Sequence, residues 1–255
     1  MEKHILKNQI YLGNCLELLK QVPDKSIDMI LCDPPYGTTK EPFDKPLNLE
    51  LLWKEYKRVI KDNGAILLFA QTPYDKILGT SNLPMLRYEW IWEKTEATGF
   101  FNAKKMPLKA HENILVFYKK LPVYNPQFTT GHKPVNSFVK RIEVANKSAI
   151  YGNNTKEIKG GGTTKRYPRS VLRFSTDKQK EHYINFQKPI ALCEYMIKTY
   201  TNVGDTVLDN CCGSGSTCVA CIHLDRDYIG MELNPDNYNI AVERCATAER
   251  KKKNV

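Results

Sequence analysis

The chain has 255 residues and a formal net charge of +10, which is typical of proteins with a polyanionic partner but does not by itself decide for one. Its 42% apolar content is enough for a sizeable core, in one large domain or in a core with a modest insertion. No stretch approaches the roughly 18 apolar residues of a membrane span, and the first residues lack the apolar core of a signal peptide, so we expect a cytoplasmic protein without a membrane partner.

The first half of the chain alternates apolar runs with amphipathic stretches, which predicts a mostly parallel α/β sheet. The expected strands and their intervening helices fall near residues 9–12, 15–21, 27–32, 47–61 and 64–70. Gly64 is expected to close the second helix. Trp90–Glu93 and Glu112–Tyr118 are expected to form a later pair of strands.

Asp33-Pro34-Pro35-Tyr36 follows the expected buried strand 27–32, at the edge where open α/β sheets bind ligands. Two successive prolines fix the backbone φ angle and remove two N–H donors, so the turn is stiff. The Asp33 carboxylate and the Pro34 carbonyl can both accept protons from an exocyclic amino group, while the Tyr36 ring stacks on a planar substrate. The same residues also fit a plain Asp-Pro turn with a buried tyrosine, so a second feature is needed to distinguish a ligand site from a structural turn.

Residues 121–180 lack the apolar periodicity of their flanks and contain the triplet Gly160-Gly161-Gly162. We expect an insertion here, with residues 1–120 and 181–255 forming the core. Basic and aromatic residues interleave in this segment, a mixture that can contact phosphates while rings stack on displaced bases. The alternative is a solvated loop that binds nothing.

The last quarter of the chain returns to the alternating pattern. The expected elements are helix 188–200, strand 205–209, helix 215–224, strand 227–231 and helix 235–250. Glycines after Asp209 let the backbone approach a ligand closely, and Glu232 lies 23 residues beyond Asp209, close to the spacing at which an acidic residue binds ribose hydroxyls. The pattern indicates a nucleoside cofactor, although Gly213-x-Gly215 lacks the third glycine of a dinucleotide site.

The eight cysteines are expected to be reduced packing residues. Cys211, Cys212, Cys218 and Cys221 raise a zinc hypothesis, because Cys218-x-x-Cys221 has the spacing of metal ligands. No second C-x-x-C accompanies this pair, and its members are expected to face the sheet from one side of a helix. Core packing is the better explanation, so we expect no metal.

In their order along the chain, these motifs resemble the S-adenosylmethionine-dependent amino-methyltransferases of DNA, which modify adenine N6 or cytosine N4. In the β group of that family a D-P-P-Y motif precedes the glycine loop, as Asp33 precedes Gly213 here. This order argues against small-molecule methyltransferases, whose glycine loop comes first. Further segments that resemble the family are Gly13–Cys15, Val22–Asp28, Tyr88–Lys94, His111–Phe117 and Gln187–Pro189.

The resemblance implies a Rossmann-like α/β fold with a mostly parallel seven-stranded sheet, an antiparallel strand and a circularly permuted motif order. It implies S-adenosylmethionine as cofactor, DNA as partner and a bacterial, phage or plasmid source, and it leaves a homodimer and a cognate restriction enzyme open. It also places target recognition in the insertion 121–180.

The residues of the expected site follow from the same resemblance. The implied catalytic residues are Asp33, Pro34, Pro35 and Tyr36. The implied cofactor-binding residues are Asn14, Cys15, Asp33, Gln187, Lys188, Pro189, Asp209, Asn210, Cys211, Gly213, Ser214, Gly215, Ser216, Thr217, Glu232 and Leu233. The implied DNA-binding residues are Lys133, Lys140, Arg141, Lys165, Arg166 and Arg169.

Three stretches depart from the family pattern, and one of them is Ile184-Asn185-Phe186, which stands where the family has His-Pro-Thr. Asn14 stands where the family usually has Asp, so a carboxylate contact to the cofactor adenine becomes an amide that accepts one hydrogen bond and donates another. Asn210 and Cys211 stand where the family has Pro and Phe, so a smaller, polarisable side chain replaces an aromatic packing surface.

The expected reaction is direct methyl transfer to the N6 amino group of an adenine flipped out of the duplex. Cytosine N4 is the alternative, although that branch more often has Ser at the position of Asp33. A non-catalytic DNA-binding relative is the third interpretation. Cytosine C5 chemistry is set aside, because it needs a cysteine after a proline and none of the 14 prolines precedes a cysteine.

Overall fold

The computed structural model describes residues 5–37, 44–134, 138–144, 154–176, 183–184 and 186–253. The chain forms two compact units, one from Met1–Asn125 with Ser170–Val255 and the other from Pro126–Arg169. The second unit is shorter than the insertion 121–180 expected from the sequence, because residues on both of its flanks join the larger unit.

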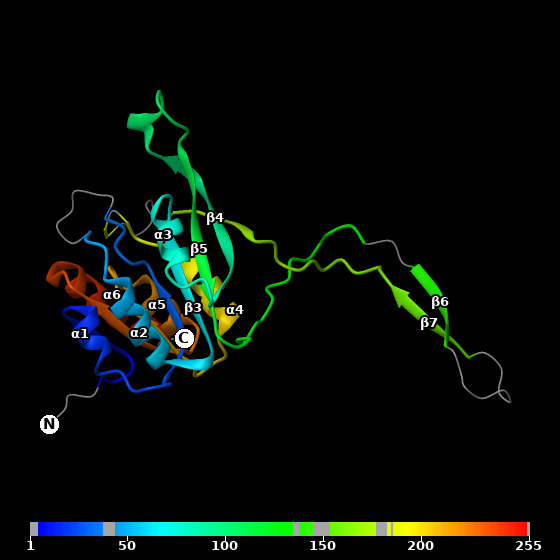
Figure 1. The fold of residues 1–255 in the computed structure, drawn as a ribbon, viewed down its shortest axis with the longest axis horizontal. Coiled ribbons are helices and arrows are strands. Elements are labelled where there is room, and N and C mark those ends of the chain that lie inside the picture. The colour runs from blue at the N-terminus through cyan, green and yellow to red at the C-terminus, as the bar shows by residue number, and fades with distance from the viewer. Residues whose placement is uncertain are drawn as a thin grey trace. The chain divides into compact units, whose positions relative to one another are not determined.

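An eight-stranded sheet runs through the larger unit in the order β1-β10-β9-β2-β3-β5-β4-β8 (Figure 1). The strands are β1 (Gln9–Leu12), β2 (Ile27–Cys32), β3 (Ile60–Ala70), β4 (Leu86–Thr98), β5 (Lys109–Phe117), β8 (Val171–Phe174), β9 (Thr206–Asp209) and β10 (Asp227–Glu232). β5 runs antiparallel to both of its neighbours, and the other pairs in this sheet are parallel. The predicted mostly parallel sheet with one antiparallel strand is confirmed.

The sheet has one strand more than the seven expected. β8 pairs in parallel with β4 and lies in the segment that the sequence marks as an insertion. Its burial alternates, so that Leu172 and Phe174 pack against the core while Val171 and Arg173 are exposed. A strand of four residues with one buried face carries too few apolar positions to stand out from its basic surroundings.

Helices cover both faces of the sheet, and they divide the core into two layers. The helices are α1 (Cys15–Leu19), α2 (Leu49–Val59), α3 (Tyr74–Thr80), α4 (Ile190–Tyr200), α5 (Ser216–His223) and α6 (Pro235–Lys253). The first three pack with Ile30, Ile66 and Leu68, and the last three pack with Met29 and Leu67. Neighbouring strand residues thus point to opposite layers, as the two-residue period of a strand requires.

Gly64 does not end a helix, so that prediction is wrong. α2 ends at Val59 and β3 begins at Ile60, which places Gly64 inside the strand. A Cβ at this position would lie 2.7 Å from the Ile60 side chain and 2.8 Å from the Asp28 carbonyl oxygen. Glycine is needed here for the close approach of β2 and β3, whose register shifts nearby.

The unit Pro126–Arg169 contains an antiparallel ribbon of β6 (Phe138–Val144) and β7 (Asn154–Gly160). Nearer its ends, Thr129 and Arg166 exchange backbone hydrogen bonds, and the rings of Phe128 and Tyr167 lie 4.6 Å apart. This unit therefore has local order of its own, built from strand pairing and one aromatic contact.

The cysteines of α5 have the packing role expected of them. Cys218 and Cys221 are completely buried in the layer below α4 to α6, and all eight thiols are free. Within the described ranges, no three His, Cys, Asp or Glu side chains are placed to hold a metal ion. None of the helices described is both long enough and apolar enough to cross a membrane.

Candidate active site

The turn Asp33–Tyr36 and the glycine loop lie side by side, because β2 and β9 are neighbouring parallel strands and both features follow their carboxyl ends. The segment Gln187–Pro189, which leads into α4, reaches the same edge of the sheet. Lys188 Nζ lies 2.5 Å from Asp33 Oδ2, although the two residues are 155 positions apart in the chain. Three of the predicted motifs thus meet at one edge.

Both oxygens of the Asp33 carboxylate accept a hydrogen bond. The Tyr36 hydroxyl donates to Oδ1 at 2.5 Å, and the Lys188 ammonium donates to Oδ2 at 2.5 Å. The side chain of Asp33 is one quarter exposed. Burial raises the pKa of Asp33 above its ordinary value, and the neighbouring Lys188 only partly opposes this effect. The carboxylate is therefore held in place by two donors.

Asp33 stands at the end of a row of alternating charges. Lys94 Nζ lies 2.6 Å from Glu112 Oε1, Glu112 Oε2 lies 3.3 Å from Lys188 Nζ, and Lys188 reaches Asp33. Burial alone would raise the pKa of Glu112, but the two lysines hold it below its usual range. Burial alone would lower the pKa of Lys188, but the two carboxylates raise it well above its usual range. Each of the four groups has a partner of opposite charge, which offsets the cost of burying it.

Lys94 and Glu112 come from β4 and β5 and were given no role in the sequence prediction. Both stand inside segments that resemble the methyltransferase family. Two opposite charges next to the apolar runs of these segments were the signal that could have marked them.

Two tyrosines stack beside the carboxylate. The rings of Tyr36 and Tyr74 are 5.2 Å apart with an angle of 29° between their planes. Tyr74 begins α3, which the sequence analysis did not predict, and it is 3% exposed. Its hydroxyl is buried without a hydrogen-bond partner among the described residues. Tyr74 thus extends the aromatic wall that the sequence predicted from Tyr36 alone.

The glycine loop has the backbone that its sequence predicts. Gly213 has φ 52° and Gly215 has φ 80°, angles that favour glycine. A Cβ on Gly215 would lie 3.0 Å from the Ala241 side chain, so α6 can pack closely on the loop. Arg244 of α6 is buried and donates to the carbonyl and the hydroxyl of Ser214, at 2.6 and 2.8 Å. Arg244 therefore anchors the loop to α6, a role that the sequence analysis did not predict.

Glu232 also binds the backbone of this loop. Its Oε2 accepts from the Gly213 N–H at 2.8 Å, and its Oε1 accepts from the Asn234 N–H at 2.8 Å. Each carboxylate oxygen has a second lone pair for another donor. Asp209 is also buried, and its burial raises its pKa to about 7. Both acidic side chains stand at strand ends, where the sequence analysis places them.

Asn14 and Cys15 lie close to Glu232, because the Gly13 N–H donates to the Glu232 carbonyl at 2.8 Å. Asn14 caps α1 by accepting from the Leu16 N–H at 2.9 Å. A hydrogen bond from the Cys211 thiol lowers the pKa of Cys15 to about 7. Cys15 and Cys211 of the two predicted cofactor segments are thus in contact.

The remaining predicted cofactor residues lie on the same loops. Ser214 Oγ donates to Gln187 Oε1 at 3.3 Å, and Tyr56 of α2 donates to Asn210 Oδ1 at 2.5 Å. Ser216 and Thr217 are buried in the first turn of α5, whereas Leu233 is half exposed.

The predicted DNA-binding side chains belong to the unit Pro126–Arg169 and are exposed or nearly so. Arg141 pairs with Glu157 at 3.1 Å. Arg166 donates to the carbonyl oxygens of Lys133 and Thr163, at 2.5 and 2.8 Å. Arg166 therefore ties two segments of this unit together, which is a structural role that its sequence context did not indicate.

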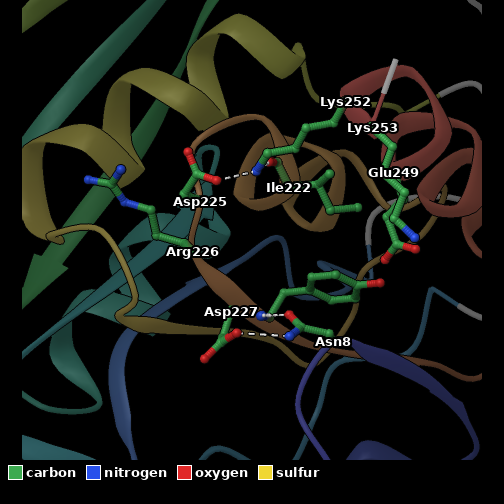
Figure 2. Close-up of a pocket in the computed structure, with 9 residues that line it drawn as sticks. Asn8, Ile222, Asp225, Arg226, Asp227, Glu249, Lys252 and Lys253 are labelled. Atoms are coloured by element: carbon green, nitrogen blue, oxygen red, sulfur yellow. Dashed lines mark hydrogen bonds and ion pairs between the residues drawn. The ribbon is translucent and has the colours of Figure 1, made fainter. Parts of the chain in front are cut away.

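A separate pocket of about 470 Å³ lies at the opposite end of β10 (Figure 2). Its walls include Asn8, Asp227 and Lys252, and Lys252 forms an ion pair with Asp225 at 2.5 Å. Asp227 begins β10, whereas Glu232 ends it. This pocket contains none of the predicted site residues, and it is distinct from the edge that holds Asp33.

Comparison with known proteins agrees with the motif order. The family model for N6/N4 DNA methylases matches residues 27–243, and the chain therefore belongs to this family of DNA methylases. The resemblance inferred from the sequence is thus confirmed.

Two similar proteins with assigned names cover nearly the whole chain. The Type II methyltransferase M.HpaI of Haemophilus parainfluenzae is 31% identical over 253 residues, covering 94% of this chain and 74% of that protein. The DNA adenine methyltransferase YhdJ of Escherichia coli is 27% identical over 249 residues, covering 92% of this chain and 82% of that protein.

Solved structures share the fold. The M1.HpyAVI–SAM complex has a TM-score of 0.62 at 22% identity and covers 92% of this chain and 98% of its own. The PvuII DNA methyltransferase, described as cytosine-N4-specific, has a TM-score of 0.63 at 16% identity and covers 98% of this chain and 94% of its own. The Rossmann-like methyltransferase fold expected from the sequence is confirmed.

Replacing Lys188 by Met should lower the free energy of unfolding by about 3–5 kcal/mol near neutral pH, because Asp33 and Glu112 would both lose a buried cation. The pKa values of the two carboxyls would then rise in the folded state, so both groups would take up protons as the pH falls. The deficit should therefore shrink from about pH 8 to about pH 5, as measured by urea unfolding. Lys120→Met, at an exposed ion pair with Asp62, is the control and should change stability by less than about 1 kcal/mol at either pH. A deficit independent of pH would contradict the coupling.

Proposed function

We propose that the chain is a site-specific DNA methyltransferase that uses S-adenosylmethionine to methylate the N6 amino group of adenine. The observation that carries this proposal is the Asp33 carboxylate, partly buried at the carboxyl edge of the sheet and already bonded to an ammonium group. A carboxylate that binds the N–H groups of Lys188 has the geometry to bind those of an adenine amino group.

The residues around the glycine loop suit a nucleoside cofactor. Gly213 and Gly215 adopt positive φ angles that let the loop turn sharply at this edge, and Glu232 keeps free lone pairs for ribose hydroxyls. Asn14 and Cys15 flank the same edge and are proposed to contact the adenine of the cofactor. S-adenosylmethionine would supply an electrophilic methyl group on its sulfonium centre.

The residues of the catalytic turn prepare the amine that accepts this group. The lone pair of an adenine amino nitrogen is shared with the ring, so the amine is a poor nucleophile. Hydrogen bonds from its two protons to Asp33 and to the Pro34 carbonyl favour a more pyramidal, electron-rich nitrogen. Tyr36 and Tyr74 supply a stacked aromatic wall for the flipped base.

Lys188 is proposed to give up its hydrogen bond to Asp33 when the target amine binds. In the structure its ammonium occupies Asp33 Oδ2, one of the two acceptors proposed for the target amine. Glu112 offers a second carboxylate to which Lys188 can remain paired when the amine binds. The ammonium thus favours the ionised form of Asp33 before the substrate arrives, at a site where burial favours the neutral acid.

Cytosine N4 is the second candidate, because the solved relatives include a cytosine-N4-specific enzyme of the same fold. Adenine is favoured by Asp at position 33 and by the adenine methyltransferase among the similar proteins. Digesting the DNA of cells that express the chain and identifying the modified nucleoside by mass spectrometry distinguishes the two. N4-methylcytosine without N6-methyladenine would overturn the proposed specificity.

Asp33→Ala should reduce methyl transfer to DNA more than tenfold and leave the affinity for S-adenosylmethionine nearly unchanged, because the carboxylate acts on the target amine. A radiolabelled methyl-transfer assay and calorimetry with the cofactor measure the two effects. Asp24→Ala, which removes an exposed carboxylate paired with Arg58, is the control and should keep full activity. Retention of more than a tenth of the wild-type rate by Asp33→Ala would refute the assigned role.

Glu232→Ala and Gly213→Val should each weaken S-adenosylmethionine binding, the first by removing acceptors at the loop and the second by placing a branched side chain at a positive φ. Calorimetry of the purified variants measures both changes. Glu243→Ala, an exposed position on α6, should bind the cofactor as the wild type does. Unchanged affinity in both site variants would place the cofactor elsewhere.

The unit Pro126–Arg169 is proposed to contribute to DNA binding through its exposed basic side chains. Lys165→Ala combined with Arg169→Ala should weaken duplex binding and reduce the slope of log affinity against log salt by up to about 0.9 per lost phosphate contact. Arg166 is left intact because it ties the unit together. Lys251→Ala with Lys253→Ala removes the same charge from the exposed end of α6 and is the control. Equal salt slopes in the two double variants would mean that this unit makes no phosphate contact of its own.

A further inference from the structure

β4 and β5 continue past the rest of the sheet as a two-stranded arm (Figure 1). Asn113 of β5 pairs with Ala70, the last residue of β3, and the two arm strands remain paired beyond this point as far as Thr98 and Lys109. Lys109 is four positions before Asn113, so β5 extends about 14 Å beyond the end of β3, whereas β8 accompanies β4 as far as Lys94. The turn that joins them lies farther out still.

This turn, residues 99–108, exposes several apolar side chains. Phe100 and Phe101 are 79% and 102% exposed, and Met106 is half exposed. The backbone is nevertheless ordered, because Phe100–Asn102 form a 3-10 turn and Asn102 accepts from two later N–H groups. Two aromatic rings held outward on an ordered turn indicate a surface that meets a partner.

A row of ion pairs links the base of the arm to the proposed catalytic carboxylate. Its two strands carry Lys94 and Glu112, the ion pair that leads through Lys188 to Asp33. Asp33 follows Cys32, which pairs with Leu68 near the end of β3. The exposed turn therefore projects from the same edge of the sheet as the catalytic turn, and a partner bound by one lies within reach of the other.

The charge of the turn identifies the partner. Lys104, Lys105 and Lys109 lie between residues 99 and 109, and the same stretch contains no acidic residue. A second copy of this chain, with a net charge of +10, would be repelled by such a surface, whereas DNA would be attracted. A two-stranded β-ribbon also fits the major groove of duplex DNA, and phenylalanines are among the side chains that proteins insert between base steps.

From these features we infer that the β4–β5 arm is a second DNA-contacting element, in which Phe100 and Phe101 stack on bases beside the target and Lys104 and Lys105 bind phosphates. The inference rests on the proposed action on DNA. It assigns the rings a task at that site, which is to replace part of the stacking that the duplex loses when the target base turns out.

The test compares Phe100→Ala/Phe101→Ala with Phe100→Tyr/Phe101→Tyr, which keeps both rings. The probe is a duplex carrying the sequence that the wild-type chain methylates in cells expressing it. The alanine variant should bind this duplex at least about tenfold more weakly, with unchanged affinity for S-adenosylmethionine, and the tyrosine variant should bind like the wild type. With a mismatch at the target base, which lowers the cost of flipping, the loss should be smaller.

Leu6→Ala/Val203→Ala is the matched control, because it removes two exposed apolar side chains next to the amino ends of β1 and β9, at the opposite edge of the sheet. It should leave DNA affinity unchanged. Wild-type affinity in the alanine variant, or an equal loss in the tyrosine variant, would overturn the inference. A change of oligomeric state in sedimentation without a change in DNA affinity would assign the turn to a protein partner instead.

Failure of the proposed function would give a different result. If the wild-type chain methylated no DNA, the methyltransferase proposal would be wrong. The alanine variant and the wild type could still be compared by their affinity for a mixed-sequence duplex without cofactor.

Discussion

The ion pair between Asp33 and Lys188 is the interaction on which the rest of the site depends. It joins the turn after β2 to the segment before α4, and through Glu112 and Lys94 it reaches β5 and β4. Each of these charges would be costly to bury alone, so each segment needs the others in place. A polar row of this kind has few alternative arrangements, and it sets the position of the proposed catalytic carboxylate relative to three strands and one helix.

The cofactor side of the edge is built on a different principle. The glycine loop is held by the Glu232 carboxylate at Gly213 and by Arg244 at Ser214, so two side chains outside the loop fix its backbone conformation. The carboxylate side therefore gains its precision from paired charges, and the loop side gains it from hydrogen bonds to backbone groups. The two sides meet because β2 and β9 are neighbours. The order of these two strands would therefore bring a cofactor at the glycine loop close to a base at Asp33.

Two parts of the molecule carry exposed basic residues without acidic neighbours in sequence, the β4–β5 turn and the ends of the unit Pro126–Arg169. They differ in how they are built. The turn projects on paired strands that are rooted in the core of the larger unit, whereas the second unit is held by its own ribbon and by the carbonyl contacts of Arg166. Rigid support suits the role proposed for the turn beside the target base, whereas the order of the second unit rests on its own strand pairing.

The sequence by itself determined the family, the parallel α/β sheet and the placement of Asp33, Gly213 and Glu232 at strand ends, because these depend on local patterns and on motif order. It missed β8, α3 and the long extension of β4 and β5, whose few apolar positions are spread among charged ones. Only the tertiary structure decided that Lys188, predicted as a cofactor residue, bonds to Asp33, and that Glu112, Tyr74 and Arg244 support the site. These partnerships join residues far apart in the chain, and a single sequence carries no local signal of which charges or rings will meet once the strands are ordered.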